Sequence, residues 1–194
     1  LELSGKERPR VMHIPTAIED KRVYSEFFLS GFASIASDMD VLYLVDENPP
    51  IEELRERILS RDIIYIEGGN TLKMMKRWRH LGVDKILKEA HEKGIVLSGN
   101  SAGAICWFEY GHSDSMSFYS DDWDYIRVKR LGILDGICCP HYLEEERVED
   151  FKRYIRKYPQ TGIAIDTYTN MEFIDGNYRV FGEEGMQVNA YKVY

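Results

Sequence analysis

Short apolar runs that are typical of β-strands alternate with helix-like segments along most of the chain. The runs at residues 63–66 and 95–97 read IIYI and IVL and contain no charged side chain. Strands become this apolar when helices cover both faces of a parallel sheet. The alternation therefore predicts an α/β fold with a mostly parallel sheet and helices on both of its faces.

The remaining elements follow from hydrophobic periodicity and from turn residues. Further strands are expected at residues 11–14, 41–45, 137–139 and 162–165, and helices at 51–59, 71–79, 83–92 and 144–157. Near the C-terminus, the turn Asp175-Gly176-Asn177 separates two strand-like segments and predicts a β-hairpin.

The first helix carries a start signal of its own. Thr16 and Glu19 have the spacing of a capping box. Tyr24, Phe27 and Phe28 then lie along one helical stripe. Gly31 and Ile35 continue this stripe, so the pattern predicts a helix after Thr16.

Composition limits the classes of function. The 194 residues, 44% of them hydrophobic, suit one domain that covers residues 1–194. The net charge of −8 disfavours nucleic acid and anionic membranes, because both attract basic surfaces. The start, LELSGKERPR, lacks a signal-peptide core and a Met. The three cysteines give neither a disulfide framework nor a CxxC pair. We expect a cytoplasmic protein that needs no cofactor, and a homodimer is a candidate assembly.

The strongest chemical signal is Gly99-Asn100-Ser101-Ala102-Gly103, a G-x-S-x-G sequence. It follows an apolar strand and precedes small residues that can start a helix. A nucleophile elbow needs this strand–turn–helix context, because the sharp turn lifts the serine Oγ above the sheet. The alternative is an ordinary tight turn with a capping serine.

A second signal is the loop Glu67-Gly68-Gly69-Asn70-Thr71, which also follows a strand. In a parallel sheet, loops after strand C-termini share one edge, so this loop is expected beside Ser101. Its glycines would let a backbone N–H approach a reacting carbonyl and form an oxyanion hole with the N–H of Ala102. Asn70 is a candidate for substrate binding. The alternative is a plain loop, since the phosphate-binding glycine patterns are absent.

A serine nucleophile needs a base, and histidine is the usual one. His141 follows an apolar strand and Pro140, which places it on the expected functional edge. His13, His80 and His91 lie within or at the ends of regular elements and are interpreted as structural. His112 lies in a polar stretch, residues 111–124, and is the weaker alternative.

Two aspartates compete for the role of orienting the base. Asp166 ends a strand on the same edge and is slightly favoured by the pattern. Asp114 lies between Ser101 and His141 in the chain, and its other interpretation is loop ordering or substrate binding. The residues alone therefore indicate a serine hydrolase on a parallel sheet. The distance along the chain from Ser101 to His141 is short for an ordinary α/β-hydrolase.

The segments IIYIEGGNTLKMM, GIVLSGNSAGAICWF, ICCPHY and TGIAID resemble the dipeptidase E (aspartyl dipeptidase) and cyanophycinase family of serine peptidases. The resemblance implies a class I glutamine amidotransferase-like fold with serine in place of the cysteine nucleophile. It implies Ser101 as nucleophile, His141 as general base, and Gly69 and Ala102 as oxyanion donors. Asp114 and Asp166 match the two positions at which members of the family carry the third catalytic residue, an acid.

The resemblance has two departures and leaves other functions open. An N-terminal strand of the family is missing, and no arginine matches a substrate-carboxylate site, so specificity for an N-terminal aspartate does not transfer. The leading hypothesis is a serine peptidase that acts on short peptides. The alternatives are a non-catalytic small-ligand binding protein and an esterase or amidase for a non-peptide metabolite. Residues 118–125, FYSDDWDY, are a candidate lid or an ordinary surface loop.

Overall fold

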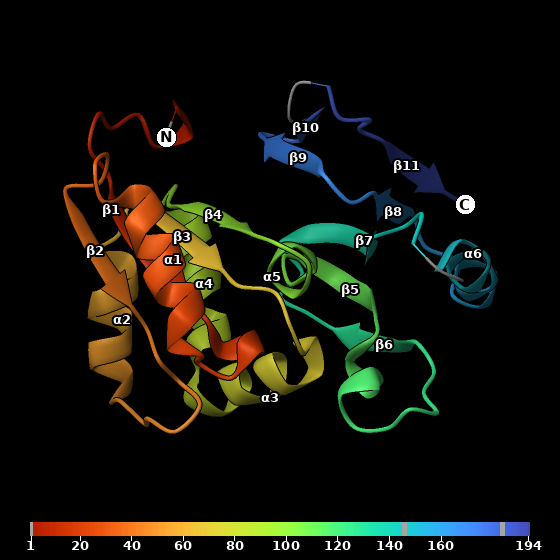
Figure 1. Cartoon of the computed structure of the whole chain (residues 1–194), viewed down its shortest axis with the longest axis horizontal. Coiled ribbons are helices and arrows are strands. Elements are labelled where there is room, and N and C mark those ends of the chain that lie inside the picture. The colour runs from red at the N-terminus through yellow and green to blue at the C-terminus, as the bar shows by residue number, and fades with distance from the viewer. Residues whose placement is uncertain (1, 145–146, 183–184) are drawn as a thin grey trace. The chain divides into compact units, whose positions relative to one another are not determined.

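The computed structural model describes residues 2–144, 147–182 and 185–194. The chain divides into two compact units, Leu1–Cys106 and Trp107–Tyr194, and each is described by itself. Both units are α/β and contain parallel strands (Figure 1). The predicted α/β fold with mostly parallel strands and helices is therefore confirmed.

The first unit holds a four-stranded sheet in the order β2-β1-β3-β4. All neighbouring strands are parallel. The elements in chain order are η1 (Glu2–Ser4), β1 (Arg10–Ile14), η2 (Thr16–Ile18), α1 (Arg22–Phe32), β2 (Asp38–Val41), α2 (Ile51–Leu59), β3 (Ile63–Ile66), α3 (Thr71–Leu81), α4 (Val83–Glu92), β4 (Val96–Gly99) and α5 (Ala102–Ile105).

Both faces of this sheet are buried. Val11 and Ile63 pack with Phe28 of α1 on one face. Alternation along a strand turns the neighbouring side chains to the opposite face. These side chains on β1 and β3 are also buried: Met12, Ile14, Ile64 and Ile66. Helices α2, α3 and α4 supply further buried side chains: Leu54, Ile58, Met74, Trp78 and Leu87. Because all four strands run the same way, the loops after β1, β3 and β4 meet at one edge.

The second unit contains a five-stranded sheet in the order β11-β8-β7-β5-β6. Its three central strands are parallel, and the two edge strands are antiparallel. The elements are β5 (Phe108–Ser113), η3 (Ser115–Phe118), β6 (Ile126–Lys129), β7 (Leu134–Pro140), α6 (Arg147–Lys157), β8 (Gly162–Ile165), β9 (Thr169–Ile174), β10 (Asn177–Gly182) and β11 (Ala190–Val193). Helix α6 buries Phe151 and Ile155 against Ile137, Cys139 and Ala164. Strands β9 and β10 pair as the predicted hairpin.

The structure corrects the prediction for the first helix. Thr16 begins a short 3-10 turn, and α1 starts only at Arg22. Helix α1 buries Ser25 and Phe28. Phe27 is 81% exposed and Tyr24 is 42% exposed. The predicted start at Thr16 was therefore wrong, and of the aromatic side chains in the predicted stripe Phe28 is buried, whereas Tyr24 and Phe27 are exposed.

The polar stretch after the elbow also differs from its prediction. Residues 111–113 belong to β5, and His112 and Ser113 are buried. The predicted strand at residues 41–45 is shorter and earlier, ending at Val41. No helix among the described residues has both the length and the apolar character to cross a bilayer. The single-domain assignment of residues 1–194 stays a prediction.

Candidate active site

Ser101 stands between β4 and α5 in a strained backbone conformation. Its φ is 47° and its ψ is −112°. A positive φ is rare for a side chain other than glycine and costs energy. A nucleophile elbow has this kind of strained strand-to-helix turn. The sequence prediction of an elbow at Ser101 therefore agrees with the local geometry.

Glycines on either side of Ser101 allow the tight packing of the turn. A Cβ on Gly99 would lie 2.6 Å from the carbonyl oxygen of Ile66, and one on Gly103 would lie 2.1 Å from the same atom. Real Cβ atoms do not come this close, so β3 and the elbow can be neighbours only with glycine at both positions. The G-x-S-x-G spacing thus has a steric reason in this chain.

The loop after β3 lies directly against the elbow. A Cβ on Gly68 would be 3.2 Å from the Cβ of Ser101. Gly69 has a φ of 130°, and a Cβ there would lie 2.3 Å from the carbonyl oxygen of Ala17. The loop therefore approaches Ser101 through backbone, with no side chain between.

The backbone donors of this loop differ in what they bind. The N–H of Gly68 donates to the carboxylate of Glu67 at 3.1 Å, and that of Asn70 donates to the carbonyl of Ala17 at 2.8 Å. Neither the N–H of Gly69 nor that of Ala102 has an acceptor within the part of the chain that the structure describes. Buried or half-buried backbone donors normally have partners. Two donors left open beside Ser101 can therefore stabilise an oxyanion.

Asn70 has a structural role in this loop. Its side-chain oxygen caps α3 by accepting the N–H of Lys73 at 3.0 Å. The residue is buried. A helix cap of this type stabilises a helix by about 1 kcal/mol. Binding of substrate by Asn70 stays a prediction.

His141 follows β7 in the second unit, as predicted. Its φ is 52°, and its ring is partly exposed. The Nδ1 atom lies 3.2 Å from the hydroxyl of Thr167 and 3.7 Å from a carboxylate oxygen of Glu144. The Thr167 hydroxyl also donates to Glu144. A hydroxyl and an acid together therefore hold Nδ1 of this ring.

The two predicted aspartates have different surroundings. Asp114 forms an ion pair with Arg147. Asp166 is 7% exposed, and neither of its carboxylate oxygens has a hydrogen-bond partner of normal geometry among the described residues. The nearby Tyr191 has a raised pKa because of burial and because of the Asp166 carboxylate. In the described structure neither aspartate makes a hydrogen bond or ion pair with His141.

The predicted residues therefore fall into two sets. Ser101, Gly69, Ala102 and Asn70 lie together in the first unit. His141, Asp166 and Asp114 belong to the second unit. Sequence reasoning missed Glu67, Glu144 and Thr167. Glu67 had a usable signal, because an acid stands directly between a strand and the Gly-Gly loop.

A cysteine, a histidine and an acid form another cluster inside the second unit. The Sγ of Cys139 lies 3.5 Å from Nδ1 of His112, and Nε2 of His112 lies 2.6 Å from Asp150. Cys139 and His112 are fully buried. Burial raises the pKa of Cys139 to about 12, so the thiol is not an active nucleophile. The sequence interpretation of Cys138 and Cys139 as a buried strand agrees with this burial.

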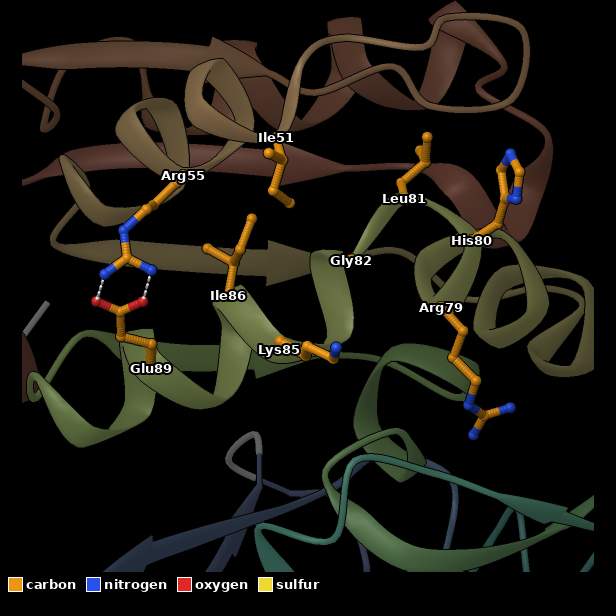
Figure 2. A pocket seen from close by; sticks show the side chains of 9 residues that line it. All are labelled: Ile51, Arg55, Arg79, His80, Leu81, Gly82, Lys85, Ile86 and Glu89. Carbon is orange, nitrogen blue, oxygen red and sulfur yellow. Dashed lines mark hydrogen bonds and ion pairs between the residues drawn. The ribbon is translucent and has the colours of Figure 1, made fainter.

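A pocket elsewhere in the first unit is lined by α2, by α4 and by the end of α3 (Figure 2). Arg55 and Glu89 form an ion pair on one side of it, and Arg79, His80 and Lys85 add basic groups. It contains neither serine nor cysteine. This pocket is therefore separate from the chemistry at Ser101.

The chain is similar in sequence to known peptidases. The model of Peptidase family S51 matches residues 1–181. The uncharacterized peptidase YgaJ of Bacillus subtilis is 36% identical over 177 residues, which are 90% of this chain and 74% of that protein. The uncharacterized peptidase Lmo0363 of Listeria monocytogenes is 25% identical over 159 residues, 80% of this chain and 75% of that protein.

A solved structure shows a similar fold. The crystal structure of a peptidase from an acI-B1 Actinobacterium matches with a TM-score of 0.74 at 16% identity, and the match covers 99% of this chain and 86% of that one. At this identity the likeness speaks for the fold alone. The family match over most of the chain, together with a strained serine beside two open backbone donors, makes the chain a serine-type peptidase and a member of peptidase family S51.

Proposed function

We propose that this protein hydrolyses short peptides through an acyl-enzyme on Ser101, with His141 as the general base. The observation that carries the proposal is the strained φ of 47° at Ser101 beside the open N–H groups of Gly69 and Ala102. A serine at such a turn presents its Oγ to a carbonyl carbon, while the two N–H groups lie where negative charge develops.

The reaction follows the sequence of steps of a serine peptidase. His141 takes the hydroxyl proton as Oγ of Ser101 bonds to the peptide carbonyl carbon, whose oxygen becomes an anion held by the N–H groups of Gly69 and Ala102. The imidazolium then gives the proton to the leaving amine, and the C–N bond breaks. His141 then takes a proton from water as the water oxygen bonds to the acyl carbon, and the bond between that carbon and Oγ breaks. The imidazolium gives this proton to Oγ of Ser101, and the acid product leaves.

We assign Asp166 as the first candidate for the acid that stabilises the imidazolium. Its carboxylate has open lone pairs, whereas Arg147 occupies that of Asp114. Glu144, which reaches Nδ1 of His141 together with Thr167, is the competing candidate. Comparing kcat of Asp166→Asn, Glu144→Gln and Asp114→Asn separates these candidates. Substitution of the acid that orients His141 should lower kcat the most while the free energy of unfolding stays unchanged.

The experiment that tests the function combines active-site labelling with turnover. A fluorophosphonate should give one adduct on wild-type Ser101, found by intact mass and peptide mapping. Ser101→Ala should keep its fold and lose hydrolysis of a dipeptide library by about 10⁴-fold or more. Asp62→Asn, at the opposite end of β3, is the matched control and should retain turnover. Unchanged turnover in Ser101→Ala would overturn the assignment, and labelling without peptide turnover would favour an esterase or amidase.

A further inference from the structure

Glu67, at the end of β3, uses both oxygens of its carboxylate inside the first unit. Oε2 lies 3.2 Å from Nε2 of His13, and Oε1 accepts the backbone N–H of Gly68 at 3.1 Å. Burial would raise the pKa of Glu67, but the contacts with His13, Gly68 and Asn100 hold it below its usual value. The side chain is therefore an anion bound on two sides.

The His13 side of this contact is fixed in the core. His13 lies on β1 and is fully buried. Its Nδ1 is 3.1 Å from the hydroxyl of Ser25 on α1. Its ring stacks on Phe28 with the centroids 4.6 Å apart. A buried ring that stacks on Phe28 and is bound at both nitrogens has one orientation, so it gives the Glu67 carboxylate a fixed position.

The other side of the contact is the loop beside the nucleophile. By accepting the N–H of Gly68, the carboxylate fixes the Glu67–Gly68 peptide plane, which is joined through the Cα of Gly68 to the peptide that carries the N–H of Gly69. A Cβ on Gly68 would lie 3.2 Å from both the Cβ of Ser101 and the side-chain nitrogen of Asn100, so the elbow holds Gly68 from the other side. The direction of the open N–H of Gly69 relative to Ser101 therefore depends on Glu67.

We propose that Glu67, anchored by His13, is a positioning residue that aligns the N–H of Gly69 with Ser101. The inference rests on the proposed function, in which this N–H stabilises the oxyanion. Glu67 does not touch the substrate in this role. It acts through the backbone of Gly68, and preorganised donors are effective only when they are aligned before the reaction.

The role predicts a difference between two substitutions at one position. Glu67→Gln keeps an oxygen that can accept the Gly68 N–H, and its amide can still face His13 in the other tautomer. Glu67→Ala removes the acceptor. We expect Glu67→Ala to lower kcat by about 10- to 100-fold, less than loss of an oxyanion donor itself. KM should stay within about 3-fold, and Glu67→Gln should restore most of kcat.

The measurement uses the full chain at a temperature at which every variant is folded. For each variant we would measure kcat and KM on a dipeptide, the rate of fluorophosphonate labelling of Ser101, and the affinity for a peptide aldehyde, which forms a tetrahedral adduct. In Glu67→Ala, aldehyde affinity and labelling rate should fall together with kcat. Asp62→Asn is the matched control, because Asp62 precedes β3 and binds Arg10 at 3.0 Å; it should change none of these.

Three results would overturn the inference. Equal losses in kcat for Glu67→Gln and Glu67→Ala would show that the acceptor oxygen does not matter. A lower kcat with unchanged aldehyde affinity would separate Glu67 from the oxyanion hole. Either result, with wild-type Ser101 still labelled, would leave the proposed function standing. Failure of wild-type Ser101 to react with the fluorophosphonate would remove the proposed function and this inference together.

Discussion

The two units each contain a buried histidine bound to a carboxylate, and the two pairs are alike in their first contacts. His13 on β1 reaches Glu67 through Nε2 at 3.2 Å. His112 on β5 reaches Asp150 through Nε2 at 2.6 Å. Both histidines are fully buried, and each stacks on an aromatic ring. Burial and an acid partner are therefore shared by both.

The pairs also resemble each other at the second ring nitrogen. Nδ1 of His13 lies 3.1 Å from the hydroxyl of Ser25. Nδ1 of His112 lies 3.5 Å from the thiol of Cys139. Each set contains a nucleophilic atom, a histidine and an acid in the order of a catalytic triad. Neither nucleophile is accessible, because both side chains are buried in the interior of their unit.

The difference lies in the second oxygen of each carboxylate. Glu67 binds the N–H of Gly68 beside the nucleophile. Asp150 binds Arg153, which is 77% exposed on α6. One network therefore ends at the candidate active site, and the other ends at the surface. A buried histidine–acid pair is weak evidence of catalysis by itself, and the groups at the end of the network decide its role.

The largest effects are expected when each histidine is removed. His13→Ala and His112→Ala should both lower the free energy of unfolding by about 2–4 kcal/mol, because each leaves a cavity and removes one of the two partners of the acid. Per folded molecule, only His13→Ala should lower kcat, by about 10-fold, since it releases Glu67 from its anchor. Denaturant unfolding together with kcat at low temperature measures both effects.

One result with these two variants would contradict the expected difference between the two networks. If His112→Ala lowers kcat as much as His13→Ala at an equal folded fraction, the second network is coupled to catalysis and the distinction is lost. His13→Gln provides a milder variant if His13→Ala fails to fold. Its amide can bind both Glu67 and Ser25, so it should retain more activity than the alanine variant.

Acidification should lower the stability of the second unit by a smaller amount, through His112. Burial lowers the pKa of His112, and Arg147 lowers it further, although Asp150 and Asp114 act in the opposite direction. The unfolded chain therefore binds the proton more readily than the folded one. The contribution of neutral His112 to the free energy of unfolding should be fully present above the pKa of histidine in the unfolded chain, about 6.5. It should decrease as the pH falls below that pKa, by at most about 1.4 kcal/mol per pH unit.

Comparing the free energy of unfolding at about pH 7.5 and 5.5 in wild type and in His112→Gln isolates this effect. The wild type should lose more stability on acidification than the variant. A wild type that gains stability relative to the variant would mean that Asp150 dominates and that the histidine becomes charged in the folded state.

The parts of the fold that could be predicted depend on local patterns. Helix α4 at Val83–Glu92 and strand β8 at Gly162–Ile165 have the predicted bounds, because one apolar face or a short apolar run specifies each. The elbow was also predictable. Gly99 and Gly103 permit a close approach to β3 that other residues do not, and this leaves Ser101 at the turn.

The parts that could not be predicted depend on partners far apart in the chain. His112 was predicted to lie in a polar loop. Its burial is stabilised by contacts with Asp150 and Cys139, and both residues come much later in the sequence. Glu67 and His13 are separated in the same way. Hydrophobic periodicity contains no information about such polar pairs. The prediction for the start of α1 failed for a local reason, since Thr16 begins a 3-10 turn and does not cap the helix.

The smallest effect is expected at the surface end of the second network. Arg153 pairs with Asp150 three residues away on α6. An exposed pair of this kind contributes less than about 1 kcal/mol, and salt screens it. Arg153→Ala should therefore change the free energy of unfolding by no more than that amount, and less in high salt than in low salt. It should leave kcat unchanged.

Lys85→Ala on α4 is a matched control for Arg153→Ala, since it also removes one cation from a helix surface, here in the first unit. The two variants should be equally active. A loss of kcat in Arg153→Ala alone would mean that the surface end of the His112 network reaches the reaction after all. Equal activity would instead support the view that a buried histidine–acid pair affects catalysis only where its acid holds the backbone of the active-site loop.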